Sequence, residues 1–174
     1  MKIEDNFLDQ DALDSLQTLM MGGEFAWHYC DIIDYQDDED KYQFIHFFYR
    51  EYNQLSPFIH IVNPILEIIK PVSLILIRTN LLTRTSNIVE NEFHYDISSY
   101  DDENRKTIFP EKLKQLTTSI FYVNTNNGYT KFEDGSIVES VANRMVSFSA
   151  NMKHKGTSCT DEKIRVVINF NYFD

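Results

Sequence analysis

From residue 72 onward the chain is a succession of short segments rich in aromatic and β-branched residues, and polar turns separate them. Such residues favour extended backbone, and regularly spaced short strands are typical of a sandwich or barrel. The predicted strands cover residues 72–82, 92–96, 117–123, 129–132, 136–141, 144–149 and 163–172. Between two of them, Asn126-Asn127-Gly128 predicts a tight type I′ hairpin, because Asn and Gly accept the positive φ of that turn. We therefore expect a mainly β core.

Two helices are predicted in the first 71 residues. Leucines recur on one face of residues 9–21 behind an aspartate that can cap the helix, and two glycines follow them. Ser56 and Pro57 are typical of a helix start, and Pro71 ends that second helix. We expect both helices to pack on one face of the β core, so the predicted fold class is mainly β with flanking helices (α+β).

Two further strands are predicted at residues 25–33 and 42–49, on either side of an acidic run at residues 36–40. We interpret this run as a solvated hairpin tip rather than a cation site, because charge runs usually face water. The 174 residues, 43% of them hydrophobic, suit one compact domain. Residues 1–71 would form a supporting region, and residues 72–174 the core that carries the site.

Several classes of protein are excluded by missing motifs. The five glycines are spaced so that neither G-x-G-x-x-G nor G-x-x-x-x-G-K-[ST] occurs, which excludes phosphate binding by a glycine-rich loop. Cys30 and Cys159 are too few for a disulfide framework or a four-thiolate zinc site, so the thiols are expected to be reduced. The sequence starts without the pattern of a signal peptide and has no apolar run long enough for a bilayer, which predicts a cytoplasmic protein without a membrane partner.

The net charge of −11 makes nucleic acid the less favoured partner, because polyanions are bound through Lys and Arg. The charge is uneven, however. Residues 1–56 carry 13 acidic and 3 basic residues, whereas residues 57–174 carry 14 acidic and 13 basic residues. The part of the chain with the candidate site is therefore nearly neutral.

His94 and Asp96 stand two residues apart in a predicted strand, so their side chains are expected on the same face. An imidazole and a carboxylate side by side can share a metal ion, although an H-x-D pair also arises by chance. His154, just past the predicted strand at 144–149, is the candidate third ligand. Two histidines and one carboxylate form the facial triad that leaves positions open on non-haem Fe(II).

The order His94-x-Asp96, His154 and then Arg165 resembles the Fe(II)- and 2-oxoglutarate-dependent oxygenases, and more specifically their prolyl-4-hydroxylase type. The resemblance extends from about residue 72 to residue 174. It implies a double-stranded β-helix (jelly-roll) core, Fe(II) as cofactor, 2-oxoglutarate as cosubstrate and O2 as oxidant. It further implies hydroxylation of an unactivated C–H bond, with release of succinate and CO2.

The resemblance also implies roles for two residues beyond the metal ligands. Arg165, on the last predicted strand, would bind the distal carboxylate of 2-oxoglutarate, and Tyr122 would join it there. A planar, permanently charged guanidinium suits bidentate binding of a carboxylate. The expected substrate is a small molecule or a peptide or protein, with a peptidyl proline as one candidate. The compact length is similar to short oxygenases of bacteria and their viruses, so the cytoplasm would be that of a bacterium or of a phage-infected host cell.

Strand parity extends the list of candidate pocket residues. If Arg165 points inward, Asn169 and Asn171 do so too, and two inward asparagines are unusual in a dry core. On the predicted strand before the H-x-D pair, Arg78 and Asn80 share a face. Asn80 could reach the cosubstrate and Arg78 the substrate or a carboxylate, or the two could face water at an edge.

The remaining polar residues are interpreted mainly as structural. We expect His28, His46 and His60 to be buried and hydrogen-bonded, and Cys159 to be a small buried side chain. Lys153 and Lys155 flank His154 and could attract an anionic substrate or simply be solvated. The polar stretch at residues 100–109 is long enough to form a lid over the metal, or an ordinary surface loop.

Two further hypotheses of function remain open at this point. The first is a jelly-roll binding or structural domain without turnover. The second is a cupin-like metal enzyme without a cosubstrate, which loss of Arg165 would distinguish from a 2-oxoglutarate enzyme. The oligomeric state is left open by the sequence.

Overall fold

The computed structural model describes residues 1–33, 41–97, 99–100, 106–107 and 110–174. The acidic turn expected at residues 36–40 lies outside the described residues. So does most of the stretch expected as a lid or loop at residues 100–109, within which the short strands β6 (Ser99–Tyr100) and β7 (Lys106–Thr107) pair with one another.

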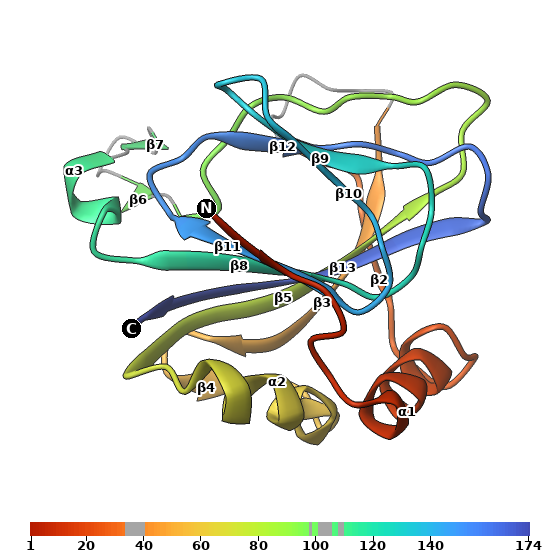
Figure 1. Ribbon diagram of the computed structural model, residues 1–174, viewed down its shortest axis with the longest axis horizontal. Coiled ribbons are helices and arrows are strands. Elements are labelled where there is room, and N and C mark those ends of the chain that lie inside the picture. The colour runs from red at the N-terminus through yellow and green to blue at the C-terminus, as the bar shows by residue number, and fades with distance from the viewer. Residues whose placement is uncertain (34–40, 98, 101–105, 108–109) are drawn as a thin grey trace.

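Most of the strands belong to one eight-stranded sheet. Its order is β1 (Lys2–Glu4), β11 (Arg144–Ser149), β8 (Thr117–Tyr122), β13 (Ile164–Phe173), β5 (Ser73–Thr83), β3 (Gln43–Arg50) and β2 (His28–Cys30), and β4 (Asn53–Gln54) pairs with β3. Every pairing in it is antiparallel. The long strands β13 and β5 lie at its centre and make the most extensive pairing (Figure 1).

A second, three-stranded sheet lies opposite the large one (Figure 1). Its order is β10 (Ile137–Glu139), β9 (Tyr129–Phe132) and β12 (His154–Gly156). Side chains from both sheets meet in a hydrophobic cluster that consists of Ile120, Tyr122, Phe132, Val138, Val146, Phe148 and Val167. The expectation of a mainly β, two-sheet core is confirmed.

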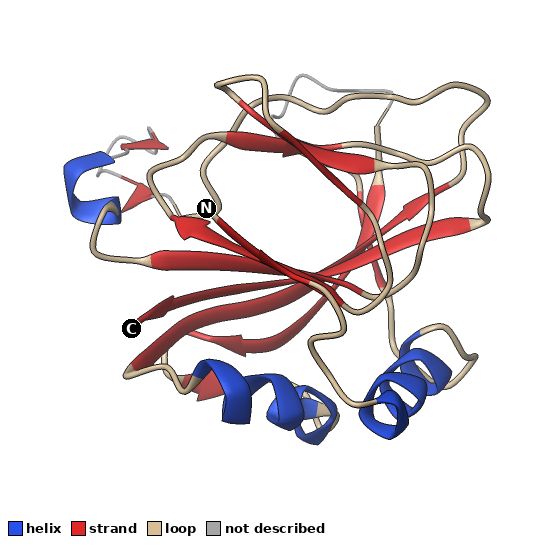
Figure 2. Cartoon of the chain, viewed as in Figure 1, coloured by secondary structure: helices blue, strands red, loops and turns tan. Residues whose placement is uncertain are grey.

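The two longer helices and a 3-10 turn lie on the other face of the large sheet (Figure 2). They are α1 (Gln10–Met20), the 3-10 turn η1 (Ile59–Val62) and α2 (Asn63–Ile69), and a short α3 (Pro110–Leu113) precedes β8. Leu16 of α1 and Ile65 of α2 are fully buried, in the same cluster as Phe121 and Ile168 of the sheet. The even positions of β13 therefore face the helices, and its odd positions face the small sheet.

Local sequence accounts for the helix ends. Of the two aspartates that could cap the first predicted helix, Asp9 and Asp11, it is Asp9 that accepts a hydrogen bond from the backbone N–H of Ala12 at 2.8 Å. The second helix begins later than expected. The hydroxyl of Ser56 accepts the N–H of Phe58 at 3.0 Å and closes a turn, the 3-10 segment follows, and Pro64 occupies the first turn of α2.

The tight hairpin expected at Asn126-Asn127-Gly128 does not form. β8 and β9 lie in different sheets, and none of these three residues has a positive φ. Tight turns with positive φ lie instead at Gly135, with φ of 89°, between β9 and β10, and at Glu51 and Tyr52, with φ of 49° and 67°, between β3 and β4. The absence of a side chain at Gly128 instead allows Arg165 and Ser158 to pack closely against it, because an added Cβ would lie 2.7 Å from Cδ of Arg165 and 2.8 Å from the carbonyl oxygen of Ser158.

The strand expected at residues 92–96 is also absent. Only His94 in this segment makes a β-bridge, with His154. The expected strand at residues 25–33 is shortened to His28–Cys30, and β1 and β12 were not predicted. Each of these two strands has three residues, which is too few for a side-chain alternation to be recognised, and the two-residue strands β4, β6 and β7 were likewise not predicted.

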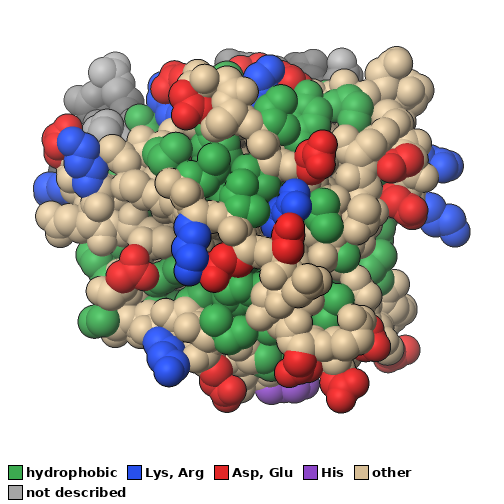
Figure 3. All heavy atoms as spheres, viewed as in Figure 1, with side chains coloured by type: hydrophobic (Ala, Val, Ile, Leu, Met, Phe, Trp, Pro, Cys, Tyr) green, Lys and Arg blue, Asp and Glu red, His purple; other side chains and the backbone are tan. Residues whose placement is uncertain are grey.

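No helix of the described residues is long and apolar enough to cross a membrane. On the face seen in Figure 3, acidic and basic side chains are interspersed with hydrophobic ones.

Candidate metal centre and cavity

His94 and His154 are joined through their backbones. The N–H of His94 donates to the carbonyl of His154 at 3.0 Å, and the N–H of His154 donates to the carbonyl of His94 at 3.1 Å. This reciprocal pair aligns the segment before Asp96 with β12 and places the two ring centroids 4.9 Å apart. The predicted convergence of the two histidines is therefore achieved by a single bridge between segments far apart in the sequence.

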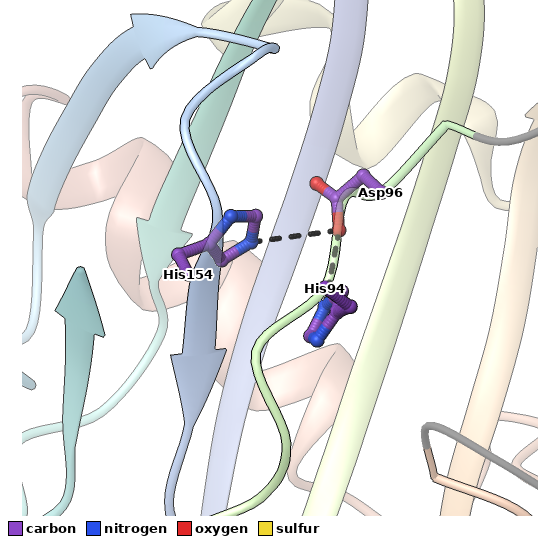
Figure 4. A group of neighbouring side chains, drawn as sticks. All are labelled: His94, Asp96 and His154. Carbon is purple, nitrogen blue, oxygen red and sulfur yellow. Dashed lines mark ion pairs between the residues drawn. The ribbon is translucent and has the colours of Figure 1, made fainter. Parts of the chain in front are cut away.

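The carboxylate of Asp96 faces both imidazoles (Figure 4). Its Oδ1 lies 3.7 Å from Nε2 of His94 and 3.6 Å from Nε2 of His154, and one ligand atom of each residue lies within 4.8 Å of the others. The Asp96 side chain is only 1% exposed, and neither of its oxygens has a hydrogen-bond partner. A buried carboxylate without a donor is costly, and a cation between the three side chains would remove that cost.

The other ring nitrogen of each histidine is directed to a backbone carbonyl. Nδ1 of His94 lies 3.0 Å from the carbonyl oxygen of Glu92, and Nδ1 of His154 lies 3.3 Å from that of Met152. A proton on Nδ1 would satisfy these carbonyls and would leave Nε2 of each ring as the nitrogen that could ligate a metal ion.

Electrostatics favour the ionised form of Asp96. Burial on its own would raise the pKa of this carboxyl, but the electrostatic attraction of the neighbouring His154 and His94 outweighs burial and holds the pKa well below its usual range. The group thus has the charge that a metal ligand requires.

The three side chains open into a cavity of about 220 Å³ between the two sheets. Its lining consists of Ile33, Gln43, Arg78, Asn80, Leu82, Asn91, His94, Tyr95, Asp96, Ile120, Thr130, His154, Gly156, Arg165, Val167 and Asn169. Ligand sites are commonly concave pockets with a few convergent polar groups, and this cavity has that form.

Arg165 is a buried cation at one end of the cavity. It is 3% exposed, and its Nε donates to the hydroxyl of Ser140 at 2.8 Å and a terminal nitrogen to the hydroxyl of Thr130 at 3.4 Å. Among the described residues no carboxylate pairs with it. Burial lowers the pKa of Arg165. A buried guanidinium without a counter-ion is a site for an anion.

Tyr122 supports this end of the cavity without lining it. Its ring lies under the guanidinium of Arg165, 5.8 Å from centroid to Cζ, and its hydroxyl donates to Thr130 at 2.8 Å. Burial raises the pKa of the Tyr122 hydroxyl. The residue is fully buried in the cluster between the sheets.

The candidate pocket residues predicted from side-chain alternation along the strands fall into two groups, those that line the cavity and one that does not. Arg78, Asn80 and Asn169 line the cavity, so Arg78 and Asn80 do not form an edge pair in water. Asn171 is also buried but is not part of the lining, and its Oδ1 accepts from the hydroxyl of Thr118 at 2.8 Å. A register shift between β13 and β5 follows Asn171.

The expectation of buried, hydrogen-bonded imidazoles is confirmed for His46 and is wrong for His28 and His60, which are exposed. His46 is buried between the carbonyl of Ala26 at 2.8 Å and the hydroxyl of Ser56 at 2.7 Å, and burial lowers its pKa. Cys159 is buried, and burial raises the pKa of its thiol. His28 and His60 are exposed, His28 stacked on His46 at 6.0 Å and His60 with Nδ1 3.3 Å from the carbonyl of Pro57.

The two lysines beside His154 are not part of the cavity lining. Lys155 pairs with Glu90 at 2.6 Å, and Lys153 pairs with Glu133 at 3.7 Å. Their charges are thus compensated within the chain.

Sequence reasoning missed Gln43, Asn91 and Thr130 among the polar cavity residues. Alternation along β9 could have found Thr130, because Tyr129 and Lys131 face outward to Glu90. Gln43 is the second residue of the strand predicted at residues 42–49, whose inward face was not assigned. Asn91 lies outside any strand, and no periodic signal marks it.

No protein-family model and no curated protein matches this sequence. Solved structures do match its fold. A prolyl hydroxylase from Trichoplax adhaerens, in complex with a peptide fragment of the hypoxia inducible factor oxygen degradation domain, is 11% identical, with a TM-score of 0.64, covering 99% of this chain and 83% of that one. HygX from Streptomyces hygroscopicus, with nickel and 2-oxoglutarate bound, is 9% identical, with a TM-score of 0.59 and coverage of 98% and 81%.

A viral collagen prolyl hydroxylase from Paramecium Bursaria Chlorella virus-1 is similar to the same extent. It is 11% identical, with a TM-score of 0.57, and the match covers 99% of this chain and 89% of that one. A similarity that covers nearly the whole chain at so low an identity is a similarity of fold. The chain therefore has the double-stranded β-helix fold of the prolyl hydroxylases and 2-oxoglutarate–Fe(II) oxygenases.

Proposed function

We propose that this protein is an Fe(II)- and 2-oxoglutarate-dependent oxygenase that hydroxylates an unactivated C–H bond. The observation that carries the proposal is the carboxylate of Asp96, buried without a hydrogen-bond donor and directed at Nε2 of both His94 and His154. The fold of the chain is consistent with this chemistry but does not by itself assign it.

The donor set fits Fe(II). His94, Asp96 and His154 would hold the ion through two imidazole nitrogens and one carboxylate oxygen, the combination typical of non-haem Fe(II) oxygenases. When bound with 2-oxoglutarate, the iron supplies O2 activation: one oxygen atom enters the substrate as a hydroxyl group and the other enters succinate, while CO2 is released.

Arg165 would provide the anchor for 2-oxoglutarate. Its guanidinium is buried, faces the same cavity as the three metal ligands and has no carboxylate partner among the described residues. A bound dicarboxylate would supply that partner, with Thr130 beside it and the ring of Tyr122 holding the guanidinium plane in place. The large sheet and the small sheet both contribute to this arrangement, so the whole chain would act as one unit.

Asn80 receives a different role from the one expected. Its Nδ2 donates to Gln43 at 2.6 Å, and its Oδ1 accepts from Arg78 at 3.2 Å and from Asn169 at 3.3 Å. Its hydrogen-bonding capacity is largely used within the chain. We propose that it positions Arg78 and Asn169 rather than binding the cosubstrate.

The direct test is release of succinate. The protein is loaded anaerobically with Fe(II), mixed with 2-oxoglutarate and candidate substrates, and exposed to O2. We expect succinate from the wild type and none above background from His94→Ala. Arg84→Gln, an exposed arginine just after β5, serves as the matched surface control.

Two outcomes would overturn the proposal. If the protein binds Fe(II) and 2-oxoglutarate but releases no succinate with any substrate, it is a binding domain with this fold. If metal-dependent turnover persists in Arg165→Ala without any change in 2-oxoglutarate affinity, the protein is a metal enzyme that does not use this cosubstrate.

A further inference from the structure

A relay of hydrogen bonds runs along the wall of the cavity that the large sheet forms. Nε2 of Gln43 donates to the carbonyl of Ile32 at 3.0 Å, and Nδ2 of Asn80 donates to Oε1 of Gln43 at 2.6 Å. Oδ1 of Asn80 then accepts from two donors, Nε of Arg78 at 3.2 Å and Nδ2 of Asn169 at 3.3 Å.

The two ends of this relay determine the direction of every amide in it. The carbonyl of Ile32 can only accept, so Gln43 must present its nitrogen there and its oxygen to Asn80. The guanidinium of Arg78 can only donate, so Asn80 must present its oxygen to it. Asn169 faces that same oxygen and must present its nitrogen. The oxygen of Asn169 is therefore left over as an acceptor.

This remaining acceptor has no donor in the structure. Asn169 is 7% exposed and lines the cavity, and its Oδ1 is buried without a hydrogen-bond partner. The relay uses its Nδ2, so rotation of the amide would only exchange one unpaired atom for another. A ligand with an N–H group would satisfy it.

Arg78 supplies a positive charge at the same place. It is half-buried, it lies directly across from Asn169 in the pairing of β5 with β13, and it makes no ion pair with a described residue. Its Nε is held by Asn80, which leaves the outer nitrogens of the guanidinium to bind an anion. The wall thus combines a cation and an unpaired acceptor.

This pair is well separated from the proposed cosubstrate anchor. In the same strand pairing, Arg165 lies across from Leu82 and Asn169 lies across from Arg78. Four residues along a strand correspond to about 13 Å at about 3.3 Å per residue. The cavity therefore offers two anion sites, and the three proposed metal ligands line the same cavity.

We propose that this wall binds the head group of a free α-amino acid, with the carboxylate on Arg78 and an N–H of the amino group on Oδ1 of Asn169. The inference rests on the proposed function and names its substrate class: a free amino acid, hydroxylated on its side chain. A residue inside a peptide has no α-carboxylate, and a proline inside a peptide has no N–H either, so neither would satisfy both groups.

The test is a binding measurement that needs no turnover. Protein loaded with Zn(II) and 2-oxoglutarate is titrated with the free protein amino acids by isothermal calorimetry. Each amino acid that binds is compared with its carboxamide and with its N-acetyl derivative. We expect at least one free amino acid to bind and saturate. Both derivatives should bind at least tenfold more weakly, because the carboxamide lacks the negative charge for Arg78 and the N-acetyl form offers Asn169 one neutral N–H in place of a charged ammonium group.

Two variants test whether Arg78 and Asn169 are the source of the preference for a free amino acid over its derivatives. In Arg78→Gln the free acid should lose at least tenfold in affinity and bind no better than its carboxamide. In Asn169→Ala the preference for the free amine over the N-acetyl form should disappear. Arg84→Gln is the control and should match the wild type. Unchanged 2-oxoglutarate affinity in Arg78→Gln, measured in the same way, shows that the variant folds and that Arg78 does not hold the cosubstrate.

The results that would overturn the amino-acid proposal differ from those that would overturn the proposed oxygenase function. If 2-oxoglutarate binds but no free amino acid does, or if the carboxamides bind as well as the acids, the head-group assignment is wrong and the oxygenase proposal stands. Equal binding of N-acetyl and free forms would identify the carboxyl end of a peptide as the ligand and overturn the free amino acid. If Zn(II) and 2-oxoglutarate do not bind at all, both proposals fail.

Discussion

The side chain of Arg165 passes so close to Gly128 that there is no room for a Cβ atom at position 128. Such an atom would lie 2.7 Å from Cδ of Arg165 and 2.8 Å from the carbonyl oxygen of Ser158. Separations below 3.0 Å require something to shift, and a backbone carbonyl shifts less easily than a side chain. Only glycine at position 128 lets the arginine extend to Ser140 and Thr130.

Gly128→Ala should therefore lower the free energy of unfolding by about 1–3 kcal/mol, the usual cost of overpacking. It should also weaken 2-oxoglutarate binding, because Arg165 must move. Urea denaturation and calorimetry measure the two effects. Gly23→Ala is the matched control, since a Cβ there meets nothing within 4 Å. If both glycine variants behave alike, the close packing around Arg165 has no energetic consequence.

Metal should stabilise the protein through Asp96. A divalent ion at a concentration 100 times its Kd adds about 2.7 kcal/mol to the free energy of unfolding. Asp96→Asn should lose most of this gain, because a neutral amide oxygen replaces the buried carboxylate. Differential scanning calorimetry with and without Mn(II), in the absence of O2, measures the difference. Asp14→Asn, on the exposed face of α1, should keep the full gain, and retention of the gain in Asp96→Asn would remove Asp96 from the site.

Arg165→Met should weaken the binding of 2-oxoglutarate strongly while changing the free energy of unfolding of the protein only slightly. Loss of charge-assisted hydrogen bonds to a carboxylate should cost about 3 kcal/mol or more, roughly a hundredfold or more in the Kd for 2-oxoglutarate. The free energy of unfolding should change by only about 1 kcal/mol, since the variant removes a buried charge that has no carboxylate partner. Calorimetric titration and urea denaturation give both numbers. Arg84→Met is the surface control, and wild-type affinity in Arg165→Met would contradict the assignment.

Glu90 should contribute to stability in acid. Hydrogen bonds from Lys155, Tyr129 and Lys131 lower the pKa of this carboxyl from 4.5 to about 2. Its ionised form therefore stabilises the fold fully above pH 4.5, and this contribution is lost as the pH falls from 4.5 through about 2. The side chain is 31% exposed, so solvent limits the contribution to about 1 kcal/mol.

Glu90→Gln should thus flatten the fall in unfolding free energy between pH 4.5 and 2. Urea denaturation at a series of pH values measures this slope. The exposed Glu67 of α2 provides the comparison, and Glu67→Gln should keep the slope of the wild type. An unchanged slope in Glu90→Gln would show that its three partners do not favour the ionised form in solution.

The parts of the site that the sequence predicted are those that depend on long, regular elements. Parity along β13 correctly put Arg165 and Asn169 on the face of the cavity, because a ten-residue central strand keeps its alternation. Parity also put Asn171 in the lining, and this prediction is wrong, since the cavity ends before Asn171 and the register shifts there. Alternation predicts a face, but it does not predict how far a cavity extends along that face.

Features that depend on the assembly of the two sheets were not predictable. The turn chemistry of Asn126-Asn127-Gly128 is local, whereas the assignment of β8 and β9 to different sheets is a property of the whole fold. His94 and Asp96 do face a common point, yet not because residues 92–96 form a strand: the single bridge of His94 to His154 orients the segment. Gln43 was missed because its importance comes from its contact with Asn80.

The reciprocal backbone hydrogen bonds of His94 and His154, at 3.0 and 3.1 Å, affect how the proposed site binds a metal ion. Two of the three proposed ligands are held at a fixed spacing by main-chain atoms, so a metal ion meets a chelating pair that is already assembled. Little conformational entropy is then lost on capture, and preorganised sites of this kind bind with less penalty than those that must fold around their ion. Exchange of one divalent ion for another should accordingly proceed without unfolding of either sheet.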